Sequence, residues 1–522
     1  MPLARALRAA VPLAIFGSSC AGPSRAPQLE PSHDEHPVLA VAVREEPEPP
    51  PLPPNVARAT APRHIGRCEP SAESYKFTVA HLNDMQARYS ERIAGRSRYA
   101  YVAGYLRALK DEVPETLVLD AGDDYEKGSI ADLRSMGEAT RLLVQALPID
   151  VRTIGNHDFA YGKDAVLRDV QLSVHPVLAA NVAYKDGSSP FLPYVRVDVG
   201  CVKVGIVGLV TQNYGANDRP SKEPYDGVLV QNERYTDVLD ALARAHRSEV
   251  DVMIALDHLG LYEDALIASR VPSIDLFVGG HSEDLVKDPL SVTRADGSRA
   301  WVVQAGHFAR TIGRLDLAFS PRDRRLSMER ARIVEVDGQL PYVEEVAELA
   351  KKLEREYAPE AHAPIAYAKS EVRQGQEMAD LLWRAAREQW AVDAMIVGRD
   401  LFWDGLPAGP ITLQRLYDAV LVQREPAGTT GFSSLYVLEL KGAELIDLQS
   451  KAFAGPMFAV YAPSAVSPSG TYRLAIEKRA MTYPSVAFRG PTKLAEGRYA
   501  GEMIDLVESY ARARTRRGLS ID

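Results

Sequence analysis

From Tyr75 onward, short apolar runs recur along the chain with segments of helical character between them, and several runs end in polar residues. Runs of this length predict the strands of an α/β sheet. They are Phe77–Leu82 before Asn83 and Asp84, Leu117–Leu119 before Asp120 and Asp123, Val204–Val210, Val252–Leu256 before Asp257 and His258, and Leu276–Val278 before Gly279 and His281. Because open α/β sheets place their chemistry at the carboxyl ends of strands, these polar residues predict a functional site there.

The pattern changes after this region. Pro341–Arg355 has apolar residues at helical spacing and predicts a linker helix. The rest of the chain combines a predicted helix, Glu377–Trp390, with strand-like runs such as Leu435–Leu440 and Tyr472–Ile476. We expect an α/β domain over 71–335, a linker over 336–362 and a smaller α+β domain over 363–522.

The first residues predict an export signal. Arg5 and Arg8 precede an apolar stretch from Ala9 to Phe16, which is too short for a permanent membrane span. The run up to Cys20 resembles a bacterial lipoprotein signal, in which Cys20 carries the lipid, and the alternative is an ordinary cleaved signal over 1–20. In both cases we expect a protein of the cell envelope (periplasm or outer membrane) or a secreted one. Residues 21–70 are rich in proline and predict a disordered linker.

The composition limits which classes of partner and which cellular compartment the protein is expected to have. The 522 residues are too many for one core, and the net charge of −9 argues against nucleic acid as the main partner. It does not argue against a phosphate substrate, because bound metals can supply positive charge. The three cysteines are Cys20, Cys68 and Cys201. If Cys20 is lipidated, Cys68 and Cys201 can pair in an oxidising compartment, and a buried free thiol at Cys201 is the alternative.

Several separate clusters hold residue types that bind metals. Two metals bridged by a carboxylate can hold a phosphoryl group and activate a water, and such a site needs oxygen and imidazole ligands on short connections. Each cluster alone is weak evidence for a metal site, because a single Asp at a strand end is more often a cap or turn residue. Their combination, with glycines beside them, is hard to obtain by chance. The clusters are Asp84 with Gln86, Gly122-Asp123, Gly155-Asn156-His157-Asp158, His258, and Gly280-His281-Ser282-Glu283.

These clusters resemble the 5′-nucleotidase family of calcineurin-like metallophosphoesterases, which includes periplasmic UDP-sugar hydrolases. The resemblance covers about residues 75 to 320. It implies a four-layer α/β/β/α catalytic domain followed by a smaller α+β C-terminal domain of the 5′-nucleotidase type. The matching stretches include His81-Leu82-Asn83-Asp84, Asp120-Ala121-Gly122-Asp123, Gly155-Asn156-His157-Asp158-Phe159, Asp257-His258-Leu259-Gly260 and Gly279-Gly280-His281-Ser282.

The resemblance also implies the ligands of two divalent ions, with Mn, Mg, Zn and Ca all open. Asp123 would bridge the ions, and His157 would stabilise the transition state and protonate the leaving oxygen. The other ligands of metal one would be Asp84, Gln86 and Glu283, and those of metal two Asn156, His258 and His281.

Three positions depart from the family. Gln86 replaces a histidine, and Glu283 stands where the family has His or Gln, which favours a harder ion such as Mn²⁺ or Mg²⁺. Ala160 replaces the aspartate that orients the catalytic histidine. Asp158 is the nearest carboxylate and is our second candidate catalytic residue, although its place in the motif suggests that it points elsewhere.

The C-terminal part resembles the family more loosely, because the substrate loop and the aromatic base-stacking segment are replaced. Phe402, Trp403 or Tyr483 would then offer an aromatic face and Arg399 a phosphate contact, with packing roles as the alternative.

The sequence thus predicts a monomeric, exported two-metal phosphoesterase that hydrolyses nucleotides as small-molecule phosphate esters. A catalytically weakened envelope binding protein and a phosphoesterase for a non-nucleotide ester are the alternatives.

Overall fold

The structure is a computed structural model that describes residues 68–69, 72–211, 229–231, 234–420, 433–452, 457–482, 484–490, 492, 494 and 497–522. The predicted signal, the predicted lipidation site Cys20, the Pro-rich linker up to residue 67 and the candidate Tyr483 therefore lie outside the described residues.

Two six-stranded sheets form the first part of the chain, and the apolar runs of the sequence supply their central strands. The first sheet has the order β16-β15-β1-β4-β5-β6, and the second has the order β13-β14-β12-β11-β9-β8. The strands of the first sheet are β1 (Tyr75–Leu82), β4 (Thr116–Asp120), β5 (Val151–Thr153), β6 (Val177–Leu178), β15 (Thr311–Ser320) and β16 (Arg325–Glu335). The strands of the second are β8 (Tyr194–Val199), β9 (Val202–Val210), β11 (Val252–His258), β12 (Leu276–Val278), β13 (Leu290–Thr293) and β14 (Arg299–Val303).

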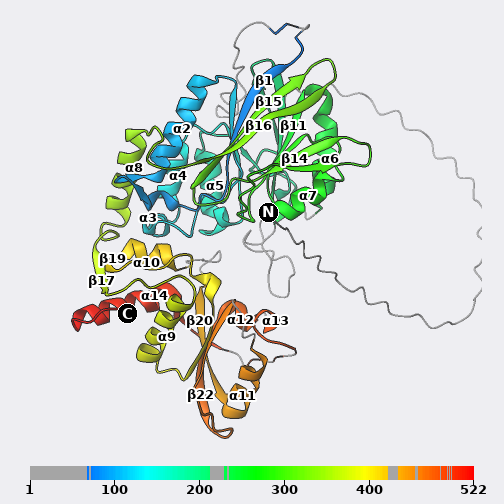
Figure 1. Cartoon of the computed structure of the whole chain (residues 1–522). Coiled ribbons are helices and arrows are strands. Elements are labelled where there is room, and N and C mark those ends of the chain that lie inside the picture. Colours follow the sequence, from blue (N-terminus) through cyan, green and yellow to red (C-terminus); the bar gives the residue numbers. More distant parts are fainter. Residues whose placement is uncertain are drawn as a thin grey trace, which may run out of the picture. The chain divides into compact units, whose positions relative to one another are not determined.

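The two sheets pack face to face. Val79 and Leu117 of the first sheet share an apolar core with Ile206 and Ile254 of the second. Helices cover both outer faces, so the layers run α/β/β/α, and Figure 1 shows α2 and α4 on one side and α6 and α7 on the other. These helices are α2 (Arg98–Glu112), α3 (Ile130–Arg134), α4 (Glu138–Gln145), α5 (Lys163–Leu172), α6 (Tyr235–His246) and α7 (Leu261–Ala268). The predicted four-layer fold is confirmed.

Parallel pairing brings the carboxyl ends of the central strands to one edge. In the first sheet β1 runs parallel to β4, with Leu82 opposite Asp120. In the second, β11 runs parallel to β9, with His258 opposite Val210, and also parallel to β12. The loops that follow these strands therefore start close together.

The C-terminal part has its own five-stranded sheet, in the order β21-β18-β22-β20-β23. Its strands are β18 (Ala394–Gly398), β20 (Ser434–Lys441), β21 (Phe458–Tyr461), β22 (Thr471–Glu477) and β23 (Arg498–Glu502). The helices of this part are α9 (Gln376–Trp390), α10 (Leu413–Ala419), α11 (Gly442–Lys451), α12 (Lys478–Thr482), α13 (Pro484–Ala487) and α14 (Met503–Arg516). The predicted helix and both predicted strands appear with bounds shifted by a residue or less.

The predicted linker helix is α8 (Glu344–Tyr357), which buries Val346, Ala350 and Leu353 and packs against α2, α3 and α4. Three two-stranded ribbons complete the described elements: β2 (Arg92–Ile93) with β3 (Arg96–Ser97), β7 (Val182–Tyr184) with β10 (Leu229–Gln231), and β17 (Pro364–Ala368) with β19 (Gly409–Thr412). Within the described ranges, no helix has the length and apolar character that a bilayer crossing needs.

Cys68 and Cys201 form a disulfide with their Cα atoms 5.5 Å apart. Cys201 lies in the turn between β8 and β9, so the bond ties the start of the folded chain to the second sheet. Of the two alternatives for Cys201, the structure has the disulfide and not the free thiol.

Candidate metal centre

Each candidate ligand lies at or just after the carboxyl end of a central strand. Asp84 and Gln86 follow β1, and Asp123 follows β4. Asn156 and His157 follow β5, His258 is the last residue of β11, and His281 and Glu283 follow β12. Most of these residues take a left-handed backbone conformation, which is rare outside glycine and collects at functional sites. They are Asp84, Gln86, Asp123, His281 and Glu283, with φ between 47° and 78°.

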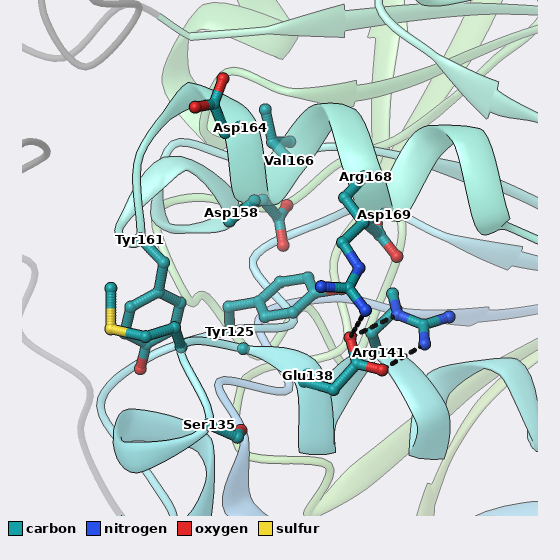
Figure 2. A pocket seen from close by; sticks show the side chains of 13 residues that line it. Tyr125, Ser135, Glu138, Arg141, Asp158, Tyr161, Asp164, Val166, Arg168 and Asp169 are labelled. Atoms are coloured by element: carbon teal, nitrogen blue, oxygen red, sulfur yellow. Dashed lines mark hydrogen bonds and ion pairs between the residues drawn. The ribbon is translucent and has the colours of Figure 1, made fainter.

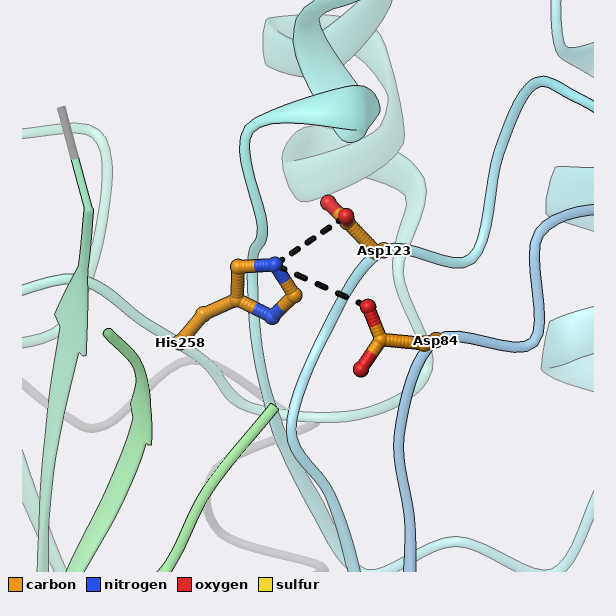
Figure 3. A group of neighbouring side chains, drawn as sticks. All are labelled: Asp84, Asp123 and His258. Atoms are coloured by element: carbon orange, nitrogen blue, oxygen red, sulfur yellow. Dashed lines mark ion pairs between the residues drawn. The ribbon is translucent and has the colours of Figure 1, made fainter. Parts of the chain in front are cut away.

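Asp84, Asp123 and His258 form the centre of the site. One ligand atom of each lies within 4.8 Å of the others, and all three side chains are buried (Figure 3). His258 Nε2 is 3.0 Å from Asp123 Oδ2 and 4.0 Å from Asp84 Oδ1. His258 Nδ1 donates to the Ala121 carbonyl at 2.7 Å, which leaves Nε2 turned toward the carboxylates. A metal-binding imidazole is commonly held in this way.

Charge at the centre is balanced by the histidine when no cation is present. Burial raises the pKa of Asp84 to about 7. Burial alone would lower the pKa of His258, but the Asp123 and Asp84 carboxylates outweigh it and raise this pKa to about 10. Burial and the nearby His258 lower the pKa of His281 to about 3, so its imidazole is neutral and able to bind a metal.

The proposed ligands of metal two converge on this centre. His281 Nδ1 is 2.9 Å from Asn156 Oδ1, and the His281 backbone N–H donates to Asp84 Oδ2 at 3.0 Å. The rings of His258 and His281 lie 5.3 Å apart. Asn156 is thus linked through His281 to Asp84, and His258 contacts Asp123 directly.

The residues expected around metal one form a second group, centred on Glu283. Gln86 Nε2 donates to Glu283 Oε1 at 2.8 Å, and Lys127 Nζ lies 3.3 Å from the same oxygen. Although burial favours the neutral carboxyl, the Lys127 ammonium helps to hold the pKa of Glu283 below its usual value. The second oxygen of Glu283 lies 3.4 Å from His307 Nδ1.

Two buried oxygens, one in the centre and one in the group around Glu283, support a bound cation. Asp84 Oδ1 and Gln86 Oε1 have no hydrogen-bond partner within the described part of the chain. A buried acceptor without a partner is costly, and coordination of a divalent ion would satisfy such an oxygen. The residues present therefore fit a metal at this position.

The prediction that Asp158 is a catalytic residue requires a correction. Its carboxylate accepts backbone N–H groups of Asp123, Asp124 and Gly155, and it does not contact the His157 ring. Asp158 thus shapes the two loops that carry Asp123 and Asn156, and its assignment as a catalytic residue is not supported.

His157 instead meets a residue that the sequence did not single out. Its Nδ1 lies 2.6 Å from Glu126 Oε2, and its Nε2 lies 3.9 Å from Asp123 Oδ2. The His157 backbone N–H also donates to Asp123 Oδ1 at 2.7 Å. The only sequence signal for Glu126 is that a carboxylate follows Asp123 in a loop already assigned to the site.

Comparison with known proteins identifies the domain that carries these residues. Residues 77–282 match the model of the calcineurin-like phosphoesterase family, and this range holds every candidate ligand except Glu283, which follows directly. The chain contains a calcineurin-like phosphoesterase domain. The calcineurin-like phosphoesterase domain predicted from the sequence motifs is therefore confirmed.

Curated relatives that the chain matches are named 5′-nucleotidases and apyrase. The chain is 29% identical over 287 residues to human 5′-nucleotidase, covering 49% of each protein. It is 30% identical over 282 residues to a snake venom 5′-nucleotidase of Gloydius brevicauda, covering 48% of this chain and 47% of the relative. The match to an apyrase of Tabanus yao is 26% over 312 residues and covers 54% of each. The chain thus spans about half the length of the curated relatives it matches.

Solved structures share the fold over most of the chain. A 5′-nucleotidase precursor from Thermus thermophilus superposes with a TM-score of 0.67 at 20% identity, covering 84% of this chain and 96% of that one. The sulfate thiohydrolase SoxB, also from Thermus thermophilus, gives 0.61 at 18% identity, covering 86% and 95%. At these identities the likeness concerns the fold.

The candidate substrate residues beyond the phosphoesterase domain lie in different environments from one another. Phe402 is fully buried, so it cannot offer an exposed aromatic face, and that assignment is wrong. Arg399 Nε donates to Gln376 Oε1 at 2.7 Å. Trp403 stacks on Phe308 with ring centroids 4.9 Å apart, and Lys127 Nζ lies 4.8 Å from the Trp403 centroid. Of the described candidates, Trp403 is the one linked to the proposed metal-one group, through Lys127.

A cavity of 260 Å³ has Asp158 among its lining residues (Figure 2). Tyr125 and Tyr161 line it together with Glu138, which forms an ion pair with Arg141. None of the described candidate ligands is among its lining residues. It is therefore separate from the metal centre of the phosphoesterase domain.

Gly155→Ala should weaken metal binding. A Cβ at Gly155 would overlap the Asp123 carboxylate and displace it. We expect the affinity for Mn²⁺ to fall roughly 10- to 100-fold, as when a group that positions a ligand is lost. Isothermal titration of the metal-stripped protein measures this. Gly338→Ala is the control, because its Cβ would meet only Ile93 Cγ2 at 3.5 Å. Equal affinities in the two variants would contradict the placement of Asp123.

Proposed function

We propose that this protein is an exported two-metal phosphoesterase that hydrolyses nucleotides. The observation that carries the proposal is the buried group of Asp84, Asp123 and His258, whose ligand atoms lie within 4.8 Å of one another. This group lies at the carboxyl ends of strands from two facing sheets, in a domain of the calcineurin-like phosphoesterase family.

Two divalent ions would be held around Asp123. Asp84, Gln86 and Glu283 would complete the first set of ligands, and Asn156, His258 and His281 the second. When bound, the ions would supply Lewis acidity toward the phosphoryl oxygens and a nucleophilic water at neutral pH.

The protein's own groups would perform the remaining tasks. Asp123 would keep the two ligand sets together, and its Oδ1 also fixes the backbone of His157. The His157 ring directs Nε2 toward Asp123, so a proton on Nε2 can be given to the oxygen of the leaving group. Lys127 would keep Glu283 ionised and add positive charge near the phosphoryl group.

Nucleotide substrates are supported by the relatives, which are named 5′-nucleotidases and apyrase. One observation favours a non-nucleotide phosphate ester as the second candidate. Phe402 is buried and Trp403 already stacks on Phe308, so the described candidates leave no pair of free aromatic faces for a base.

Export is supported by the Cys68–Cys201 disulfide, because such bonds persist in oxidising compartments. The apolar stretch before Cys20 supports the same proposal. Lipidation of Cys20 and the monomeric state stay predictions from the sequence.

A substrate panel tests the proposal. The Mn²⁺-loaded protein would be assayed for release of phosphate or nitrophenol from AMP, UDP-glucose, 4-nitrophenyl phosphate and bis(4-nitrophenyl) phosphate. We expect turnover, with AMP preferred. Turnover of the nitrophenyl esters without AMP or UDP-glucose would favour the non-nucleotide ester. No turnover of any ester despite bound metal would contradict the enzyme and favour a binding protein.

Gln86→His should shift metal preference. An imidazole binds Zn²⁺ more strongly than an amide oxygen does, and histidine tolerates the φ of 47° at this position. We expect the ratio of Zn²⁺ affinity to Mn²⁺ affinity to rise on the order of tenfold. This is the lower end of the range of about 10- to 100-fold that is typical of changes around a metal site. Competition titrations followed by metal analysis measure the ratio. The control is Gln145→His on α4, away from the centre. An unchanged ratio would contradict a ligand role for Gln86.

A further inference from the structure

The two nitrogens of the His157 ring face different groups. Nδ1 lies 2.6 Å from Glu126 Oε2, and Nε2 lies 3.9 Å from Asp123 Oδ2 in the metal centre. A histidine that transfers a proton through one nitrogen is usually held by an acceptor at the other. The Glu126 carboxylate occupies that second position.

Glu126 is anchored to helix α3 through its backbone. Its side chain is 1% exposed, and its backbone N–H donates to Asp132 Oδ2 at 3.0 Å. Asp132 is in turn fixed by the Tyr161 hydroxyl at 2.6 Å. Glu126 and Lys127 adopt φ of 66° and 59°, a conformation that the surrounding contacts must enforce. The strained backbone conformation of Glu126 and Lys127 therefore sets the directions of their side chains.

Other carboxylates do not take this role. Asp158 is occupied by backbone N–H groups, and position 160 is an alanine. Of the carboxylates in the described ranges, those recorded within ion-pair distance of the His157 ring are Glu126, at Nδ1, and Asp123, at Nε2.

We propose that Glu126 is the positioning residue of His157. It accepts the Nδ1–H and holds the ring so that Nε2 points at the leaving oxygen of the phosphate ester. During hydrolysis of the ester, the Nε2 proton passes to the leaving oxygen as the P–O bond to that oxygen breaks. The ring keeps its Nδ1–H. The role of His157 in this step rests on the proposed function, whereas the Nδ1 contact does not.

A double-mutant cycle tests the proposal. The kcat and KM for phenyl phosphate would be measured for the parent, Glu126→Gln, His157→Ala and the double variant. Phenyl phosphate is chosen because its leaving oxygen is basic enough to need a proton. We expect Glu126→Gln to lower kcat roughly 10- to 100-fold with little change in KM. In the His157→Ala background the same change should alter kcat by less than about twofold, because Glu126 acts through the ring.

A structural role would give another result. If Glu126 only stabilised the loop, its replacement would cost the same factor in both backgrounds, and that outcome overturns the proposal. A kcat for Glu126→Gln within about twofold of the parent overturns it as well. Glu138→Gln is the matched control, because this carboxylate pairs with Arg141 and does not contact His157. Its kcat should equal that of the parent.

A second measurement does not depend on activity. Nitrogen NMR of the ¹⁵N-histidine-labelled parent reports which ring nitrogen of His157 carries a proton, with His157→Ala assigning the signal. We expect a proton on Nδ1, which Glu126 accepts. A neutral ring protonated only at Nε2 would overturn the proposal. A parent that hydrolyses no ester would contradict the proposed function, and the NMR result would still decide the role of Glu126.

Discussion

Asp123→Ala is expected to abolish most metal binding and most hydrolysis. Asp123 belongs to both proposed ligand sets, with Oδ2 3.0 Å from His258 Nε2 and Oδ1 accepting the His157 backbone N–H. Loss of one preorganised electrostatic group costs an enzyme about 10²- to 10³-fold in kcat. Because Asp123 would serve both ions, we expect a loss at the upper end of this range or beyond it.

The measurement is the kcat for 4-nitrophenyl phosphate, together with the metal content after equilibration with Mn²⁺. Asp164→Ala is the matched control, because its side chain on α5 is 95% exposed and should leave both values unchanged. The thermal unfolding midpoint shows whether the variant is folded. A folded Asp123→Ala protein with the activity of the parent would show that the site has been assigned to the wrong residues.

Removal of the disulfide should produce the largest change in stability. The Cys68–Cys201 bond closes a loop between residues separated by 133 positions. Cross-linking so long a loop restricts the unfolded chain, so Cys68→Ser with Cys201→Ser should lower the free energy of unfolding by about 2–5 kcal/mol. Cys201 precedes β9, whose far end pairs with His258, so the metal centre should keep its kcat at low temperature.

Urea unfolding of the double variant beside the parent measures this loss. Cys20→Ser is the control, because it leaves the bonded pair intact. Reduction of the parent should move its midpoint to that of the double variant. Equal midpoints for oxidised parent and double variant would contradict a stabilising bond.

The strand-end ligands could be predicted because their signals are local. A short apolar run followed by Asp84, by Asp123 or by His258 shows both the strand and the polar residue at its end. Parallel pairing then brings these ends together, as it does in any open α/β sheet. The α/β class followed from the same pattern, whereas the four-layer arrangement was implied by the resemblance to the phosphoesterase family.

The contacts made by the loop after Asp123 could not be predicted. Whether Glu126 reaches His157 and Lys127 reaches Glu283 depends on backbone angles that no hydrophobic pattern encodes. The same holds for Phe402, because the sequence around an aromatic residue beside a loop does not show whether its side chain is buried or exposed. The cysteine pairing also needed the tertiary structure, which brings two distant Cα atoms to 5.5 Å.

The contacts of Glu126 also change how the departures from the family pattern are interpreted. The alanine at position 160 suggested a weakened enzyme, but Glu126 places a carboxylate at His157 Nδ1. Gln86 and Glu283, altered together, contact one another at 2.8 Å. Both observations favour a working site over a binding protein.

The most direct test of a metal-dependent phosphoesterase is a titration of the metal-stripped protein with Mn²⁺, followed by hydrolysis of 4-nitrophenyl phosphate. We predict no hydrolysis without metal and a rate that rises and saturates near two equivalents of ion. Hydrolysis that chelation leaves unchanged would contradict this prediction.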